Sequence, residues 1–249
     1  MLAIIGGSGL TQLANLDIKR REIVRTPFGE PSGPLTFGTL GGKPVVFLAR
    51  HGYGHTIPPH KVNYRANIWA LKHGARAERV ISVASVGAIR NDMPPGTLIV
   101  PHQIIDYTWG RISTFYDGQD AHVVHSDFTE PYDGELRSSL IDIFHAAGEN
   151  VVNGAVYAAT QGPRLETAAE INRLERDGAD IVGMTGMPEA GLAREADLAY
   201  AAVCLSVNWA AGRGDSARGI HFEDIEAVQR IWLARVRRVL EHYAANLAP

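Results

Sequence analysis

A polar residue ends an otherwise apolar run near the C-terminus of this 249-residue chain. The stretch YAAVCLSVN, residues 200–208, stops at Asn208, and a glycine-rich loop follows it. An amide side chain both donates and accepts hydrogen bonds, so it suits the polar edge of a ring. Other apolar runs of the chain also end in polar or glycine residues, in the segments GGSGL, RHG, SVG, TQGPRLET and GMTGMPE.

Two of these run ends have residues that suit an anion. In GGSGL (6–10), glycines let backbone N–H groups converge and Ser8 adds a hydroxyl, although a plain strand-to-helix turn fits equally well. Position 12 is Gln, so the dinucleotide pattern G-x-G-x-x-G is absent, and so is the Lys-Ser/Thr of a P-loop. Arg50 and His51 end another run, where a guanidinium can bind phosphate through two hydrogen bonds; a solvated loop is the alternative.

The histidines of segment 50–67 do not form a metal-binding pattern. His51, His55 and His60 lie among prolines and glycines with no acidic residue nearby. A zinc site would require histidines together with carboxylates or cysteines on rigid elements. We therefore predict no metal.

Two further segments supply a carboxylate and a thioether. Glu166 falls at an expected helix start, where the helix dipole alone would favour a glutamate. Met184 and Thr185 end the next apolar run, and Met184 fits either the core or the wall of a sugar site.

The elements that must position these residues follow from seven apolar runs. Most of the runs are continuous rather than alternating, as in strands buried on both faces. They cover residues 2–7, 44–50, 79–85, 96–106, 154–162, 179–185 and 200–208.

Helical patterns lie between several of the runs and after the last one. The C-terminal pattern places an apolar face at Ile225, Val228, Trp232, Val236 and Val239. We predict an α/β fold, with one domain over residues 1–249 and a mixed, largely parallel sheet flanked by helices. Ligands of such sheets bind beyond the carboxyl ends of the strands. Residues 107–137 lack periodicity and are predicted to form a long excursion, often a functional feature.

Composition narrows the class of protein. The net charge of −3 gives no basic field for nucleic acid or an anionic membrane. The single cysteine, Cys204, rules out an internal disulfide and fits a reducing cytosol. We find no signal peptide and no apolar run of about 18 residues, so a cytoplasmic protein is expected.

Taken together, the motifs resemble one family over nearly the whole chain. The segments GGSGL, TPFGEPS, ARHGYGHTIPPHKVNYRANIWALK, GPR and GADIVGMTGMPEAGLARE are similar to those of the trimeric purine nucleoside and methylthioadenosine phosphorylases, and look most like the methylthioadenosine branch. The resemblance implies a homotrimer with a distorted mixed sheet. It also implies that phosphate displaces a purine from ribose C1′, with no metal or organic cofactor.

The resemblance also implies roles for individual residues. Met184 would lie against the ribose, and Leu165 would cover one purine face where an aromatic residue is usual. His125 matches a histidine that reaches into the 5′ pocket of a neighbouring subunit. At position 84 the family often has threonine or asparagine, whereas Ala84 offers no side-chain donor. The implied phosphate site comprises Ser8, Arg50, His51, the backbone around Ser85, and Thr185.

Glu166 and Asn208 depart from the methylthioadenosine branch, which has serine at the first position and T-D-Y-D where this chain has VNWA. Both residues are instead similar to the 6-oxopurine phosphorylases. Ionised Glu166 can accept from N1–H of a 6-oxopurine, and Asn208 can bind O6 or N7. Adenine would turn the N1 lone pair toward the carboxylate, which disfavours it. Asn208 would also stabilise the leaving purine in the transition state.

The 5′ contact depends on the register of segment 219–228. The favoured register brings in Phe222 and gives an apolar pocket for a thioether, whereas a shift of one residue brings in His221, which suits a 5′-hydroxyl. We therefore predict phosphorolysis of S-methyl-5′-thioinosine to hypoxanthine and 5-methylthioribose 1-phosphate. A general inosine/guanosine phosphorylase, a methylthioadenosine phosphorylase and a non-catalytic nucleoside-binding protein remain the alternatives.

Overall fold

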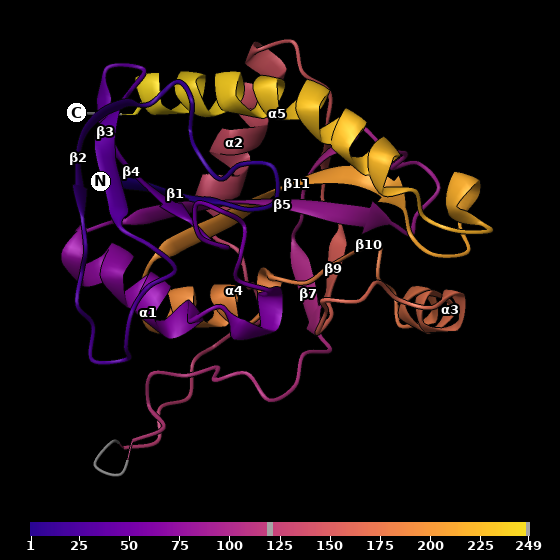
Figure 1. Ribbon diagram of the computed structural model, residues 1–249, viewed down its shortest axis with the longest axis horizontal. Helices are drawn as coiled ribbons and strands as arrows, with labels where there is room; N and C mark the ends of the chain where they lie inside the picture. The colour runs from indigo at the N-terminus through magenta and orange to yellow at the C-terminus, as the bar shows by residue number, and fades with distance from the viewer. Residues whose placement is uncertain (119–121, 248–249) are drawn as a thin grey trace.

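Figure 1 shows the computed structural model, which describes residues 1–118 and 122–247. The strands of this part form one sheet with helices on both faces. The strands are β1 (Leu2–Gly6), β2 (Asp17–Glu22), β3 (Leu35–Leu40), β4 (Lys43–Ala49), β5 (Arg79–Ala88), β6 (Leu98–Val100), β7 (Gln103–Asp106), β8 (Val151–Asn153), β9 (Val156–Ala159), β10 (Ile181–Gly183) and β11 (Ala199–Trp209). The α-helices are α1 (Tyr64–Trp69), α2 (Gly134–Ala146), α3 (Ala168–Arg176), α4 (Gly186–Glu195) and α5 (Phe222–Ala245).

The predicted fold class is confirmed, since each apolar run contains a strand. Among the described residues, six of the ten strand pairings are parallel and four are antiparallel. The run 96–106 forms two strands, β6 and β7, which are separated at Pro101, a residue with no N–H to donate to a ladder.

Several elements were not anticipated from the sequence. Three strands lie outside the predicted apolar runs, namely β2, β3 and β8. Two helices, α2 and α4, lie in segments for which no helical pattern was identified. Every residue of β2 is exposed, so its sequence DIKRRE has no buried face to mark it. The excursion is irregular over residues 107–118 and 122–133, and α2 begins at Gly134, slightly before residue 137, where the excursion was predicted to end.

The sheet divides along β5, and this division opens the space for a site. Up to Ser82, β5 pairs with β1 on one side and β11 on the other. From Gly87 onward, β10 takes the side that β1 occupied, and it runs antiparallel to β5. None of the described strands therefore pairs with residues 83–86 on that side, and these residues lie next to the carboxyl end of β1.

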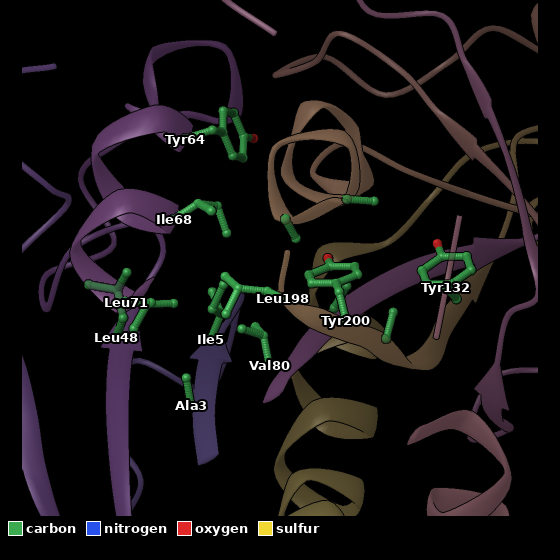
Figure 2. Close-up of a cluster of buried hydrophobic side chains, with 14 of the residues drawn as sticks. Ala3, Ile5, Leu48, Tyr64, Ile68, Leu71, Val80, Tyr132, Leu198 and Tyr200 are labelled. Atoms are coloured by element: carbon green, nitrogen blue, oxygen red, sulfur yellow. The ribbon is translucent and has the colours of Figure 1, made fainter. Parts of the chain in front are cut away.

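The two faces of the sheet carry separate apolar clusters, because side chains alternate along each strand. Ala3 and Ile5 of β1 face α1 and α4, whereas Leu2 and Ile4 face α2 and α5. Figure 2 shows the first cluster, in which Ile68 of α1 lies above the strand residues. The long ribbon of α5 crosses the opposite face (Figure 1).

The predicted apolar face of α5 is confirmed. Val236 and Val239 are buried, and Ile225, Val228 and Trp232 pack against the same cluster from the N-terminal half of the helix. The face therefore continues from the core toward the first turns of α5, which lie at the edge of the sheet. None of the described helices is long and apolar enough to cross a membrane.

Candidate active site

A cleft of about 640 Å³ lies where the sheet divides. It is bounded by the loop after β1, the end of β4, the free stretch of β5, the loops after β9 and β10, the end of β11 and the start of α5. The predicted site residues that line it are Ser8, Arg50, His51, Ser85, Leu165, Glu166, Met184, Thr185, Asn208 and Phe222. Residues as far apart in the sequence as Ser8 and Phe222, which are separated by 214 positions, thus share one space.

Two predicted residues do not line this cleft. His221 is exposed and precedes the first turn of α5, while Phe222 is among the lining residues although 67% of it is exposed. Of the two residues predicted for the 5′ contact, Phe222 thus lies at the cleft and His221 does not line it, and the contact itself remains a prediction. His125 is exposed on the excursion, so its contact with a neighbouring subunit remains a prediction.

A buried ion pair at the cleft joins Arg50 to Glu189, a residue that the sequence did not single out. Arg50 Nε lies 2.6 Å from Glu189 Oε2, and Nη2 lies 2.9 Å from Oε1. Both side chains are about 1% exposed. Ser82 and Tyr200 also donate to Glu189 Oε1, at 2.7 and 2.8 Å.

These contacts set the charge state of the pair. Burial alone would raise the pKa of Glu189, but the charge and hydrogen bonds of Arg50, supported by Ser82 and Tyr200, hold that pKa below its usual value. The pair therefore consists of a carboxylate and a guanidinium.

The Glu189 contact corrects the expected role of Arg50 as a two-bond phosphate ligand. Its Nε and Nη2 hydrogens go to Glu189 and Ser82, and Nη1 donates to the carbonyl of Val83 at 3.2 Å. In the described part of the chain, this leaves one Nη1 hydrogen for an anion. Arg50 is thus held as a fixed charge with a single free donor.

The glycine at position 7 is explained by this buried arginine. A Cβ there would lie 2.8 Å from Arg50 Nη1 and 2.6 Å from the Val83 carbonyl. The loop after β1 can therefore lie against the guanidinium only with glycine at this position. One role of GGSGL is close packing on Arg50.

His51 is buried beside Arg50 and its tautomer is fixed. Its Nδ1 lies 2.8 Å from the Ile57 carbonyl, which can only accept, so Nδ1 carries a hydrogen. Burial, followed by the charge of Arg50, lowers the pKa of His51 to about 4. The ring is therefore neutral near pH 7, and Nε2 offers a lone pair.

Glu166 is held by a threonine that the sequence analysis passed over. Thr160 Oγ1 donates to Glu166 Oε1 at 2.6 Å. Burial raises the pKa of Glu166, although the Thr160 hydrogen bond opposes this. The next residue, Thr167, caps α3 in a reciprocal pair with Glu170, which fixes the backbone at the position of Glu166.

Asn208 lies at an irregularity in β11, where the register against β5 shifts between Ser206 and Asn208. Its Nδ2 donates to the Trp209 carbonyl at 2.6 Å. Since that carbonyl only accepts, the amide orientation is set. The Oδ1 acceptor and the second Nδ2 hydrogen are left for other partners.

Two more residues that the sequence reasoning missed support the cleft. Arg111, on the excursion, donates to the carbonyls of Met184 and Met187 at 2.8 and 2.7 Å, and to the carbonyl of Gln161 at 2.7 Å. It thereby fixes the loops after β9 and β10 to each other. Gln229 lines the cleft from α5 and donates to Ser85.

The remaining wall of the cleft is apolar. It includes Ile57, Ile220, Phe222 and Ile225, the last two being one turn apart on α5. Among the described residues, no group of three or more His, Cys, Asp or Glu could hold a metal ion. The cleft thus combines an anion end, a polar edge at Glu166 and Asn208, and an apolar side.

Comparison with known proteins gives consistent results. A family model described as the phosphorylase superfamily matches residues 1–245. A probable S-methyl-5′-thioinosine phosphorylase from Xanthomonas campestris pv. campestris is 54% identical over 215 residues, which cover 86% of each chain. A 6-oxopurine nucleoside phosphorylase from Pyrococcus furiosus is 46% identical over 234 residues, covering 92% of this chain and 86% of that protein.

A solved structure has the same fold. Methylthioadenosine phosphorylase from Schistosoma mansoni, in complex with adenine, matches with a TM-score of 0.93 at 32% sequence identity. The match covers 98% of this chain and 90% of that chain.

The burial of the Arg50–Glu189 pair predicts a large effect on stability. We expect Glu189→Gln to lower the free energy of unfolding by about 3–5 kcal/mol, because it leaves a buried guanidinium without a counter-charge. Urea unfolding followed by circular dichroism measures this value.

A matched control is Asp92→Asn, which removes a carboxylate that binds Arg90 through two contacts on the surface. We expect a change within about 0.5 kcal/mol, because exposed ion pairs contribute little. Equal effects of the two substitutions would show that the buried pair has no special role in stability.

Proposed function

The chain belongs to the phosphorylase superfamily over residues 1–245, and from this premise we propose that it catalyses phosphorolysis of S-methyl-5′-thioinosine. The products are hypoxanthine and 5-methylthioribose 1-phosphate. The observation that carries the proposal is that Glu166 and Asn208 line one cleft whose other side is apolar. The proposed reaction takes inorganic phosphate as co-substrate and uses neither a metal nor an organic cofactor.

Hydrogen bonding supports a 6-oxopurine as the base. The ionised Glu166 carboxylate accepts from N1–H, and Thr160 already occupies one face of Oε1 and orients the group. The Asn208 amide donates its second Nδ2 hydrogen to O6 or accepts at Oδ1 from a protonated N7. Adenine has a lone pair at N1 instead, which would face the carboxylate.

The anion end supports phosphate as the nucleophile. Arg50 supplies a fixed positive charge and one Nη1 hydrogen, and Ser8, Ser85 and Thr185 supply hydroxyl groups. The neutral His51 ring accepts the O–H of hydrogen phosphate at Nε2, since its Nδ1 hydrogen is committed to Ile57. This arrangement selects an anion that still carries a proton.

The chemistry follows from these two ends. A phosphate oxygen bonds to C1′ as the C1′–N9 bond breaks, and the electron pair of that bond passes to the purine. Asn208 stabilises the charge that develops on the purine ring, an interaction stronger in the transition state than in the substrate. The proton lost by hydrogen phosphate balances the one gained by the purine.

The apolar side supports a methylthio group at the 5′ position. Ile220, Phe222 and Ile225 line that side, whereas His221 is not among the lining residues. A thioether has little need of hydrogen bonds. A 5′-hydroxyl buried there would give up its hydrogen bonds with water and gain none in return. A general inosine/guanosine phosphorylase is the second candidate.

The proposal includes a homotrimer in the cytoplasm. Exposed apolar side chains on the excursion, such as Trp109, Ile112 and Val123, support association between copies, because apolar surface of this kind favours contact with a partner. The buried, free Cys204 suits a reducing compartment.

The direct test uses purified protein and S-methyl-5′-thioinosine with and without phosphate, followed by chromatography. We expect one hypoxanthine for each 5-methylthioribose 1-phosphate, and no base release without phosphate. Release in the absence of phosphate would indicate a hydrolase. Tight nucleoside binding without any release would indicate a binding protein.

Asn208 is expected to act mainly in the transition state. Asn208→Ala should lower kcat for the 6-oxopurine substrate by roughly 10²-fold to 10³-fold, with a smaller change in KM. Asn208→Asp keeps an acceptor for N7–H but loses the donor, so it should shift preference part of the way toward 6-aminopurines. Steady-state kinetics with both nucleosides measure the effects, and Asn91→Asp, on the surface, controls for the added charge. Unchanged rates in both Asn208 variants would remove this residue from the base site.

Glu166 predicts a pH-dependent choice of base. Because its pKa is raised, the carboxyl gains a proton at higher pH than an exposed glutamate, and it then becomes a donor that matches N1 of adenine. The ratio of kcat/KM for the 6-oxo over the 6-amino nucleoside should therefore fall as pH falls through this pKa. In Glu166→Gln the ratio should be low and independent of pH. A ratio that varies equally in the parent and in Glu166→Gln would assign the titration to another group.

A further inference from the structure

The anion end of the cleft has fewer arginine donors than its charge suggests. Arg50 has one hydrogen left for a ligand, and Ala84, which lines the same end, has no polar atom in its side chain. The side-chain hydroxyls around it must therefore provide most of the directed hydrogen bonds to an anion. Of these hydroxyls, that of Ser85 accepts a hydrogen bond from α5.

Ser85 is contacted by a side chain from a distant part of the chain. Gln229 Nε2, on α5, donates to Ser85 Oγ at 3.0 Å across 144 positions of sequence. Both residues line the cleft and both are partly buried. Because the amide N–H occupies a lone pair of Oγ, the hydroxyl hydrogen of Ser85 remains available to a second acceptor.

The position of Gln229 is itself constrained by the loop after β1. Gly9 has a φ of +77°, and a Cβ at this residue would lie 3.4 Å from Gln229 Oε1 and 2.4 Å from Leu233 Cδ1. Glycine at position 9 therefore lets α5 pack directly against the loop that contains Ser8. With Oε1 on the Gly9 side, the amide turns Nε2 to Ser85.

One face of α5 thus spans two ends of the cleft. Phe222, Ile225 and Gln229 follow at spacings of three and four, so they lie along one side of the helix. The first two line the apolar wall, and the third contacts Ser85. The same face continues to Leu233 in the core, which anchors it.

We propose that Gln229 is a positioning residue of the phosphate site, which holds Ser85 Oγ so that its hydroxyl hydrogen donates to a phosphate oxygen. This inference rests on the proposed function, because it assigns phosphate to the anion end of the cleft. It adds, to the Ser85 hydroxyl already assigned to the anion end, the helix residue that orients this hydroxyl. Phosphate keeps this donor only while α5 is packed against the Gly9 loop.

The test is a double-mutant cycle with Gln229→Leu, Ser85→Ala and the double variant, in which KM for phosphate and KM for the nucleoside are measured separately. We expect Ser85→Ala to raise KM for phosphate about tenfold, the loss of one hydrogen bond to a charged group. Gln229→Leu should raise it about fivefold, and the double variant should match Ser85→Ala, since Gln229 acts only through Ser85. KM for the nucleoside should change less than about twofold in each case.

Matched variants separate positioning from packing. Arg230→Leu places the same side chain on the exposed side of the same turn and should leave KM for phosphate unchanged. Gln229→Glu should weaken phosphate binding more than Gln229→Leu does, because a carboxylate accepts the Ser85 hydrogen and repels the anion. Ser85→Thr keeps the hydroxyl and should restore most of the affinity lost in Ser85→Ala.

A second readout keeps the inference independent of turnover. Phosphate alone should raise the Tm of the parent protein, and this increase should be smaller in Gln229→Leu and in Ser85→Ala. If the parent protein binds phosphate but releases no base, the proposed function is wrong. The comparison of Tm values then still tests whether Gln229 and Ser85 contribute to phosphate binding. An unchanged KM and thermal response in Gln229→Leu, or additive losses in the double variant, would overturn the inference.

Discussion

The buried ion pair of Arg50 and Glu189 is the interaction on which the rest of the site depends. It joins the end of β4 to α4, and Ser82 and Tyr200 add hydrogen bonds from β5 and β11. Four elements are therefore fixed at the point where the sheet divides. A charge held in this way costs no reorganisation when an anion binds, but it leaves Arg50 few free donors. The neighbouring hydroxyls, and the side chains that orient them, gain importance for that reason.

The divided sheet brings the proposed sites for two unlike groups into one cleft. The β1 and β4 ends form the proposed anion side, and the loops after β9 and β10, with β11, form the proposed polar edge for a base. The first turns of α5 close the third side with apolar residues and reach the anion side at Gln229. The excursion takes part through Arg111, which ties two of these loops together by their backbone carbonyls.

The fold class and several of the cleft residues were predictable from local patterns. Continuous apolar runs marked the buried strands, and polar residues at their ends marked the site, so Glu166, Asn208 and Arg50 were found. Glu189 was missed since its partner lies 139 positions away, and nothing local indicates that pairing. Gln229 was missed because the C-terminal helical pattern identifies only the apolar positions of the helix, and Gln229 is polar. The charged edge strand β2 lacks a buried face, and so it left no signal.

The central claim is that the cleft joins a 6-oxopurine edge to an apolar 5′ side. The measurement that tests it most directly is kcat/KM of the purified protein at saturating phosphate for S-methyl-5′-thioinosine, S-methyl-5′-thioadenosine and inosine. We expect the first to exceed the second by roughly 10⁴-fold and the third by roughly 10-fold to 200-fold. Equal or better use of the thioadenosine would contradict the base assignment to Glu166 and Asn208, and equal use of inosine would contradict the apolar 5′ side.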